Sequence, residues 1–159
     1  EINFLFNLLS DYLKRNLNIL NKNGLKFNVI GNINKFPKDL KKALKDAVKT
    51  TAKNKKMQIN LALNYGSKDE IINSINLVIK KKLKLSKKNI EKNLYTSNIP
   101  DPDILIRTGN TNRLSNFLLW QISYSEIFFI KKLWPDFNED DYNKIIKNFK
   151  KIKRNFGNI

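Results

Sequence analysis

Hydrophobic positions follow two different spacings along the chain, and the changes of spacing mark out the predicted elements. Residues 1–22 carry apolar side chains three and four positions apart, which predicts an amphipathic helix ended by the polar run NKNG. Residues 25–31 alternate between apolar and polar side chains, as do residues 57–66, and each segment predicts a strand. The short apolar run at 103–109 predicts a third strand that leads into a turn.

Residues that favour helix starts set the expected beginnings of the remaining helices. Proline is favoured in the first turn of a helix, and serine and asparagine side chains accept hydrogen bonds from its free amide groups. The residues expected to start or cap helices are Pro37, Ser67, Ser86, Ser115 and Asn138. In the case of Ser115, the predicted helix follows immediately, from residue 116 or 117.

Helices that alternate with strands predict one α/β domain over residues 1–159. Strands joined through helices require right-handed crossovers, so we expect a mainly parallel, open sheet flanked by helices. No internal repeat is present. In such sheets ligands bind outside the carboxyl ends of the strands. Two predicted strand ends carry unusual residues, NYG at 64–66 and RTG at 107–109.

The chain contains no cysteine and no histidine. Disulfides and thiolate catalysis are therefore excluded, and so are imidazole proton transfer and the commonest zinc ligand. Chemistry in this chain must use carboxylates, hydroxyls, arginine and a hard metal ion such as Mg²⁺. No apolar run reaches the roughly 20 residues of a membrane span.

The formal net charge is +17, which by itself suggests binding to a nucleic acid or an anionic membrane. The lysines are spread over nearly every predicted helix, and 25 asparagines accompany them. This pattern favours a composition bias at solvated positions over a dedicated polyanion groove. A basic nucleic-acid-binding module is therefore the less favoured alternative, and its affinity would fall steeply with salt.

One segment of the chain lacks the lysines that are abundant elsewhere. No lysine occurs between Lys92 and Lys131, yet the segment holds two of the four arginines, Arg107 and Arg113. Planar guanidinium forks, together with the amides of a helix capped by Ser115, suit a phosphate or diphosphate better than lysine would. An ordinary strand-to-helix connection with two solvated arginines explains the same residues equally well at this point.

A longer match extends beyond the arginines. The segment DPDILIRTGNTNRLSNFLLWQISYSEIFFIKKLWPDF, residues 101–137, closely resembles the signature region of the cis-prenyltransferase family. NVIG, INLALNYG and the initial helix follow in the family's order, so the resemblance covers essentially the whole chain. It implies an open α/β fold with a hydrophobic tunnel, usually in a homodimer. It also implies condensation of an allylic diphosphate with isopentenyl diphosphate to a Z-polyprenyl diphosphate, with Mg²⁺ as cofactor.

The resemblance assigns roles to particular positions. Arg107, Arg113 and Ser115 are expected to bind the diphosphate of isopentenyl diphosphate. Glu126, in SYSEIFF, is expected to help hold the associated Mg²⁺, in a segment that lies at the family's dimer interface. Asn64, in NYG, is expected near the mouth of the active site. The surrounding apolar residues are interpreted as core and subunit contact: Phe117, Trp120, Tyr124 and residues 127–130.

The sequence departs from the family pattern at three places. RTGNT stands where the family has RTGGE, so Asn110 replaces a glycine, and asparagine tolerates left-handed backbone better than most residues. NYGSK stands where the family has NYGGR, with Ser67 and Lys68. The amino-terminal loop that carries the family's catalytic aspartate has no counterpart here. We therefore expect no catalytic residue in this sequence and a fold that is incomplete at the amino terminus.

A second function stays open beside chain elongation, that of a noncatalytic partner subunit in a heteromeric cis-prenyltransferase. NYG and the intact RLSNFLLWQ favour a catalytic parent. A hydrophobic product favours peripheral association with a membrane surface, to which the spread lysines could contribute. The residues specify neither the compartment, cytoplasmic or organellar, nor the product chain length.

Overall fold

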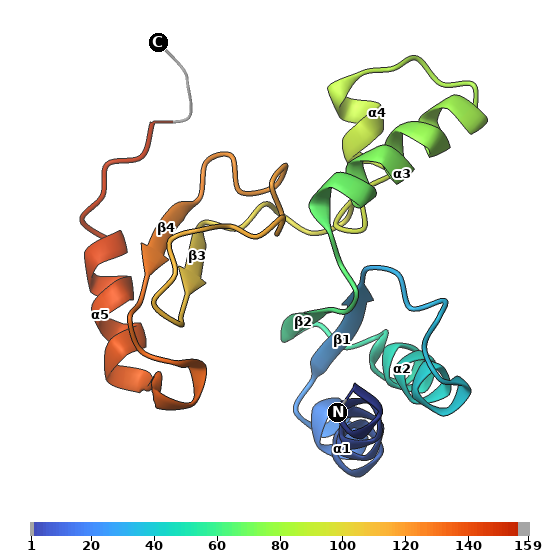
Figure 1. Cartoon of the computed structure of the whole chain (residues 1–159), viewed down its shortest axis with the longest axis horizontal. Helices are drawn as coiled ribbons and strands as arrows, with labels where there is room; N and C mark the ends of the chain where they lie inside the picture. Colours follow the sequence, from blue (N-terminus) through green and yellow to red (C-terminus); the bar gives the residue numbers. More distant parts are fainter. Residues whose placement is uncertain (1, 156–159) are drawn as a thin grey trace. The chain divides into compact units, whose positions relative to one another are not determined.

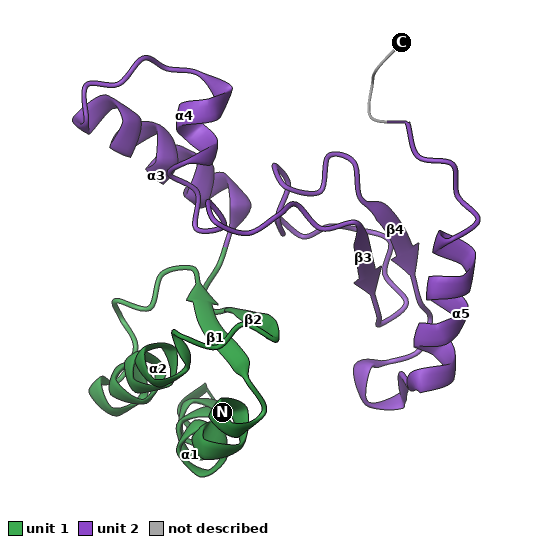
Figure 2. Cartoon of the chain, turned by 180° about the vertical axis from the view of Figure 1, so that it is seen from behind, with its two compact units in different colours: residues 1–65 green, residues 66–159 purple. Residues whose placement is uncertain are grey.

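The computed structural model describes residues 2–155 and divides the chain into two compact units. Residues 1–65 belong to unit 1 and residues 66–159 to unit 2, coloured green and purple in Figure 2. Each unit combines helices with a two-stranded parallel sheet, so the predicted α/β class and the parallel pairing are confirmed. The single domain over residues 1–159 stays a prediction.

Unit 1 runs helix, strand, helix, strand, in the predicted order. The two helices pack against the first strand, and the two strands pair in parallel from Leu25 opposite Met57 to Ile30 opposite Ala62 (Figure 1). The elements are α1 (Ile2–Lys22), β1 (Leu25–Ile30), α2 (Lys38–Thr51) and β2 (Met57–Ala62).

An apolar core holds unit 1 together, because α1, β1 and α2 each turn an apolar face inward. Its buried members are Leu13, Phe27, Leu40, Leu44 and Ala47. Burial of one such leucine or phenylalanine side chain contributes about 1.5–3 kcal/mol. Thr51 adds a polar tie between α2 and β1, since its Oγ1 accepts a hydrogen bond from the Phe27 amide at 2.9 Å and donates to the Ala47 carbonyl at 2.7 Å.

Unit 2 contains the second parallel sheet, in which Ile104 lies opposite Glu126 and Arg107 opposite Phe129. The strand that begins at Glu126 was missed by the sequence reasoning, which interpreted residues 127–130 only as core and subunit contact. The elements are α3 (Ser67–Lys80), α4 (Lys87–Glu91), β3 (Ile104–Arg107), β4 (Glu126–Phe129), η1 (Trp134–Asp136) and α5 (Glu139–Phe149).

Three of the predicted helix starts are confirmed. Pro37 immediately precedes α2. Ser86 caps α4 through its side-chain oxygen. Asn138 begins α5 with a capping box, in which its side chain accepts from the Asp141 amide while the Asp141 carboxylate accepts from the Asn138 amide. These caps depend on local backbone geometry, which neighbouring residues specify.

Two predicted caps are wrong. Ser67 is the first residue of α3, and Gly66 takes the cap position without a side-chain hydrogen bond. Ser115 starts no helix, because residues 115–124 form successive turns. The physical reason is backbone conformation, since Ser115, Asn116 and Leu118 have φ angles of 50°, 61° and 47°, which a right-handed helix cannot include.

Candidate functional site

Arg107 is the last residue of β3, at the strand end where the sequence predicted an anion site. Its side chain is half-buried, and its Nε donates a hydrogen bond to Thr111 Oγ1 at 2.8 Å. This bond restrains the guanidinium plane. The two terminal nitrogens have no hydrogen-bond partner within residues 2–155, so they can serve a ligand. A planar fork of this kind matches two oxygens of a phosphate group.

The turn after β3 is tied to the chain that follows β4. The Ile130 amide donates to the Arg107 carbonyl at 2.7 Å, the Gly109 amide to the Lys132 carbonyl at 2.8 Å, and the Asn110 amide to the Ile130 carbonyl at 3.2 Å. Gly109 and Asn110 are both left-handed, with φ of 93° and 54°. The expectation that asparagine tolerates the conformation at position 110 is confirmed.

Arg107 is one of the residues that line a cavity of about 240 Å³. The cavity is smaller than a typical pocket for a drug-sized molecule, which suits a compact polar group. Its lining residues are Leu105, Ile106, Arg107, Thr108, Leu114 and Phe117. The arginine is the one charged residue of this lining, so the cavity favours an anion.

Arg113 and Ser115 lie in the exposed part of the following turn. Because no helix begins there, the row of free amides that the sequence reasoning placed at this point does not exist. The prediction of an anion site at a helix amino terminus is therefore wrong. The donors that remain are the Arg113 guanidinium and the Ser115 hydroxyl, presented by a turn of unusual backbone conformation.

Asn64 lies in unit 1, just after β2, and joins the carboxyl ends of the two strands there. Its φ is 46°, its carbonyl accepts from the Asn32 amide at 3.2 Å, and its Nδ2 donates to the Asn32 carbonyl at 2.9 Å. Gly31 makes room for this crossing, since an added Cβ would lie 2.2 Å from the Leu63 carbonyl oxygen. Asn64 therefore has a structural role whatever else it binds.

Glu126 is the first residue of β4, and its amide donates to the Asp103 carbonyl at 2.9 Å. It lies opposite Ile104, three residues before Arg107, so the two backbones are roughly 10 Å apart along the ladder. Side chains alternate between faces, which places Arg107 and Glu126 on opposite faces of the sheet. Within one chain, the Glu126 carboxylate therefore does not lie next to the Arg107 guanidinium.

α3 carries a buried carboxylate that the sequence pattern did not indicate. Glu70, assigned only to the first turn of a helix, is 2% exposed. Its Oε1 accepts from the Tyr95 amide at 2.7 Å and its Oε2 from Gln121 Nε2 at 3.1 Å, while Gln121 also donates to Thr96 at 2.9 Å. The available signal was the helical spacing of Ser67, Glu70 and Ser74 along α3.

The pKa of the Asp101 carboxyl is raised above its ordinary value. Partial burial raises its pKa, the nearby Glu91 carboxylate raises it further, and Lys87 opposes both effects. Glu91 also accepts a hydrogen bond from the indole of Trp120 at 3.3 Å. These residues surround a cavity of about 360 Å³ that does not include the arginine turn.

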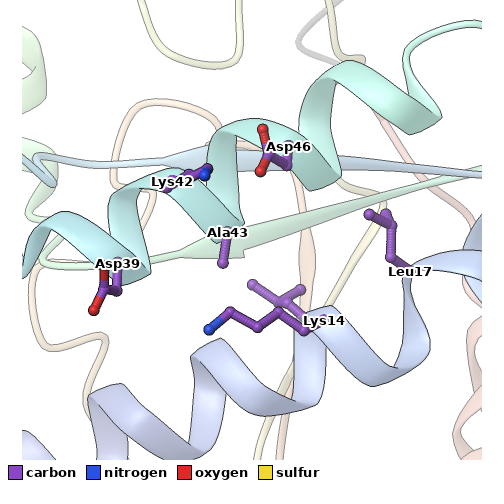
Figure 3. A pocket seen from close by; sticks show the side chains of 7 residues that line it. Lys14, Leu17, Asp39, Lys42, Ala43 and Asp46 are labelled. Atoms are coloured by element: carbon purple, nitrogen blue, oxygen red, sulfur yellow. The ribbon is translucent and has the colours of Figure 1, made fainter.

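A cavity of about 400 Å³ lies between α1 and α2 in unit 1 (Figure 3). Lys14, Asp39, Lys42 and Asp46 surround an apolar floor, and the two signs of charge balance.

Within residues 2–155 no three acidic side chains gather to hold a metal ion. The helices in the same part of the chain include none with the length and hydropathy to cross a membrane.

Comparisons with known proteins match nearly the whole chain. Residues 1–157 fit the family described as putative undecaprenyl diphosphate synthase. An isoprenyl transferase of Rickettsia typhi is 44% identical over 158 residues, which cover 99% of this chain and 70% of that protein. An isoprenyl transferase of Wolinella succinogenes is 43% identical over 159 residues, which cover 100% of this chain and 70% of that protein.

Two solved structures are similar in fold. A probable undecaprenyl diphosphate synthase from Campylobacter jejuni has a TM-score of 0.89 at 37% identity, covering 99% of this chain and 75% of that one. Lavandulyl diphosphate synthase from Lavandula x intermedia, solved with dimethylallyl diphosphate, has a TM-score of 0.90 at 32% identity, covering 99% and 72%. The chain therefore belongs to the undecaprenyl diphosphate synthase family of prenyltransferases, as its resemblance predicted.

Proposed function

We propose that this prenyltransferase elongates a prenyl chain by condensing an allylic diphosphate with isopentenyl diphosphate, giving a Z-polyprenyl diphosphate. Its family membership supports the reaction class. The similar lavandulyl diphosphate synthase was solved with dimethylallyl diphosphate, an allylic diphosphate, which supports the substrate class. The isoprenyl transferases that match the chain favour an active enzyme over the noncatalytic partner subunit.

The observation that carries the proposal is the environment of Arg107. Arg107 is half-buried at the carboxyl end of a parallel strand, its guanidinium is restrained by Thr111, and the residue lines a small cavity. We assign Arg107 to the diphosphate of isopentenyl diphosphate, with Arg113 and Ser115 as further donors from the adjoining turn. Asn64 is proposed as a substrate-binding residue on resemblance alone.

We assign Glu126 to Mg²⁺. Magnesium takes one or two protein carboxylates and completes its shell with water and substrate phosphates, so a half-buried glutamate without a surrounding acidic cluster fits it. When bound, the ion would neutralise charge on a diphosphate; it would reach the diphosphate held by Arg107 only across the proposed dimer, because one chain does not bring Glu126 to that guanidinium. Glu126→Gln should raise the Mg²⁺ concentration needed for half-maximal activity, and an unchanged metal titration would remove Glu126 from the site.

Arginine-to-lysine variants test the proposal, because lysine keeps the charge and loses the fork. In the intact enzyme, Arg107→Lys and Arg113→Lys should each lower kcat/KM for isopentenyl diphosphate by about ten- to a hundredfold, the equivalent of one charge-assisted hydrogen bond. The KM for the allylic diphosphate should change much less. Lys45→Ala, at an exposed position of α2, is the control. Lysine variants that match the parent enzyme would contradict the proposal.

We also propose a homodimer that associates peripherally with membranes. Ile127 and Phe129 on β4 are 37% and 41% exposed, and Tyr124, two residues before β4, is 54% exposed. An apolar patch of this kind marks an interaction surface. Sedimentation of the intact enzyme should show a dimer at micromolar concentration, and a fully active monomer would contradict the assembly. Flotation with anionic vesicles tests the membrane association.

The noncatalytic alternative makes a different prediction. A partner subunit would show no turnover of isopentenyl diphosphate and an allylic diphosphate by itself, and would gain turnover when mixed with a catalytic chain. An active preparation of this protein alone excludes that alternative.

A further inference from the structure

The turn that carries Arg113 and Ser115 has a backbone that its own residues do not favour. Ser115, Asn116 and Leu118 are all left-handed, with φ of 50°, 61° and 47°. For residues other than glycine this conformation is disfavoured, and least so for asparagine. Three of them within four positions persist only when the surrounding structure holds them in place.

The first turn of α3 supplies that support. The Ser67 amide donates to the Asn116 carbonyl at 2.8 Å, and the Lys68 amide donates to Asn116 Oδ1 at 2.9 Å. In the opposite direction, the Leu119 amide donates to Ser67 Oγ at 3.0 Å. Three hydrogen bonds therefore join two residues of the helix start to residues 116–119.

These bonds also complete the helix. The first amides of a helix have no partner inside it, and α3 has no side-chain cap at Gly66. Asn116 takes the place of the missing cap from 48 residues away along the chain. Gly66 permits the approach, since a Cβ added there would lie 2.8 Å from Asn116 Nδ2. The helix start and the turn thus specify each other.

Asparagine meets both requirements of position 116. Its side chain offers an acceptor for the Lys68 amide, and it tolerates left-handed backbone better than most residues. The hydroxyl of Ser67, at the position where the sequence departs from the family's NYGGR, supplies the third bond. Ser67 is fully buried and its bond to the Leu119 amide is partly buried, whereas the bond from the Lys68 amide to Asn116 Oδ1 is exposed.

We propose that Asn116 is a positioning residue for the diphosphate site. By binding the Ser67 and Lys68 amides it fixes the turn in which Arg113 and Ser115 lie, and so sets where their donors meet isopentenyl diphosphate. Ser67 has the same role through Leu119. This inference rests on the proposed function, because it assigns Asn116 to the same diphosphate site.

The test separates the side-chain acceptor from the backbone conformation in the intact enzyme. Asn116→Gly keeps the left-handed backbone and removes the acceptor, whereas Asn116→Asp keeps both. Asn116→Gly should raise the KM for isopentenyl diphosphate about tenfold, with less than a twofold change in the KM for the allylic diphosphate. Asn116→Asp should recover most of that loss. Hydrogen exchange at the Lys68 amide should accelerate in the glycine variant alone.

Lys82→Gly is the matched control, because Lys82 is an exposed left-handed residue just beyond the other end of α3, with φ of 53°. It should leave both KM values unchanged. If Asn116→Gly yields no folded protein, Ser67→Ala carries the test and should give the same selective change at about threefold, with faster exchange at the Leu119 amide.

Distinct outcomes separate this inference from the proposed function. If the Arg107→Lys and Arg113→Lys variants lose activity toward isopentenyl diphosphate but Asn116→Gly keeps the parental KM, only the positioning role is overturned. An aspartate variant no better than the glycine variant overturns it as well. Absence of turnover in the parent enzyme, or arginine variants equal to the parent, overturns both.

Discussion

α2 of unit 1 and α3 of unit 2 are both 14-residue helices that follow a strand, yet opposite kinds of contact hold them. The buried residues of α2 are Leu40, Ala43, Leu44, Ala47 and Thr51. Those of α3 are Ser67, Glu70, Ser74 and Val78. One helix is fixed by apolar packing with a single polar tie, and the other mainly by hydrogen bonds to loops.

The three polar residues of α3 each hold a different stretch of chain. Ser67 accepts from the Leu119 amide, Glu70 accepts from the Tyr95 amide, and Ser74 donates to the Ile90 carbonyl at 2.6 Å. Apolar packing is roughly non-directional, whereas a hydrogen bond fixes distance and angle. α2 therefore provides stability, while α3 fixes the positions of Ile90, Tyr95 and Leu119, of which Leu119 adjoins the turn that carries Ser115.

The largest expected effect tests the apolar side of this comparison. Leu44→Ala should lower the free energy of unfolding by about 2–5 kcal/mol, because Leu44 is 1% exposed and its removal leaves a cavity in the core of unit 1. Urea unfolding of the intact protein measures it, with the adjacent exposed Lys45→Ala as control. A loss below 1 kcal/mol would mean that the apolar core of α2 is not what stabilises unit 1.

A smaller effect is expected on the polar side. Glu70→Ala removes the acceptor of two hydrogen bonds and should cost about 1–3 kcal/mol in all, because Gln121 Nε2 keeps its bond to Thr96. It should also raise the KM for isopentenyl diphosphate, unlike Leu44→Ala, because Gln121 follows the turn that carries Ser115. Asp69→Ala, an exposed acid in the same helical turn, is the matched control. Equal results for the two acids would remove the distinction between α2 and α3.

The smallest expected effect comes from an exposed polar contact, with which the buried hydrogen bonds of α3 can be compared. The Lys132 amine and the Asn138 amide, both bonded to Asp141, lower the pKa of its carboxyl from the ordinary 3.8. A lowered folded-state pKa stabilises the protein above the ordinary value and loses that contribution as the pH falls below it. Asp141→Asn should therefore reduce the urea midpoint at pH 6, and the difference should shrink near pH 3. A difference that grows on acidification would reverse this assignment.

The sequence predicted the site in part, and the reasons differ between residues. Arg107 was found because it ends an apolar strand in a segment without lysine, and its position needs only the strand to be correct. Ser115 was predicted as a helix cap because the sequence pattern there matches one. The left-handed turn that replaces the helix is held by hydrogen bonds with Ser67 and Lys68. Lys68 lies 48 residues away from its partner Asn116 in the chain. Local propensity contains no information about such partners.

Glu70 shows the same limit. Its spacing with Ser67 and Ser74 was visible, but an acidic residue in a first helical turn is ordinarily explained by the helix dipole. The apolar residues of α3 do not mark its buried face, since Ile72 and Ile79 are 56% and 64% exposed. Only the positions of Tyr95 and Gln121 show that the carboxylate is buried and bonded.

Residues close together in the chain were enough to predict the α/β class, the helix and strand order of unit 1, the family, and the turn that carries Arg107 and Arg113. These follow from hydrophobic periodicity, local capping and a long contiguous match, all of which depend on near neighbours in the chain. The tertiary structure alone decided that β4 pairs with β3, that α3 buries its polar face, and that Asn116 caps that helix from a distance. Those features depend on bonds between residues far apart in sequence, whose donors and acceptors find one another only when the chain is folded.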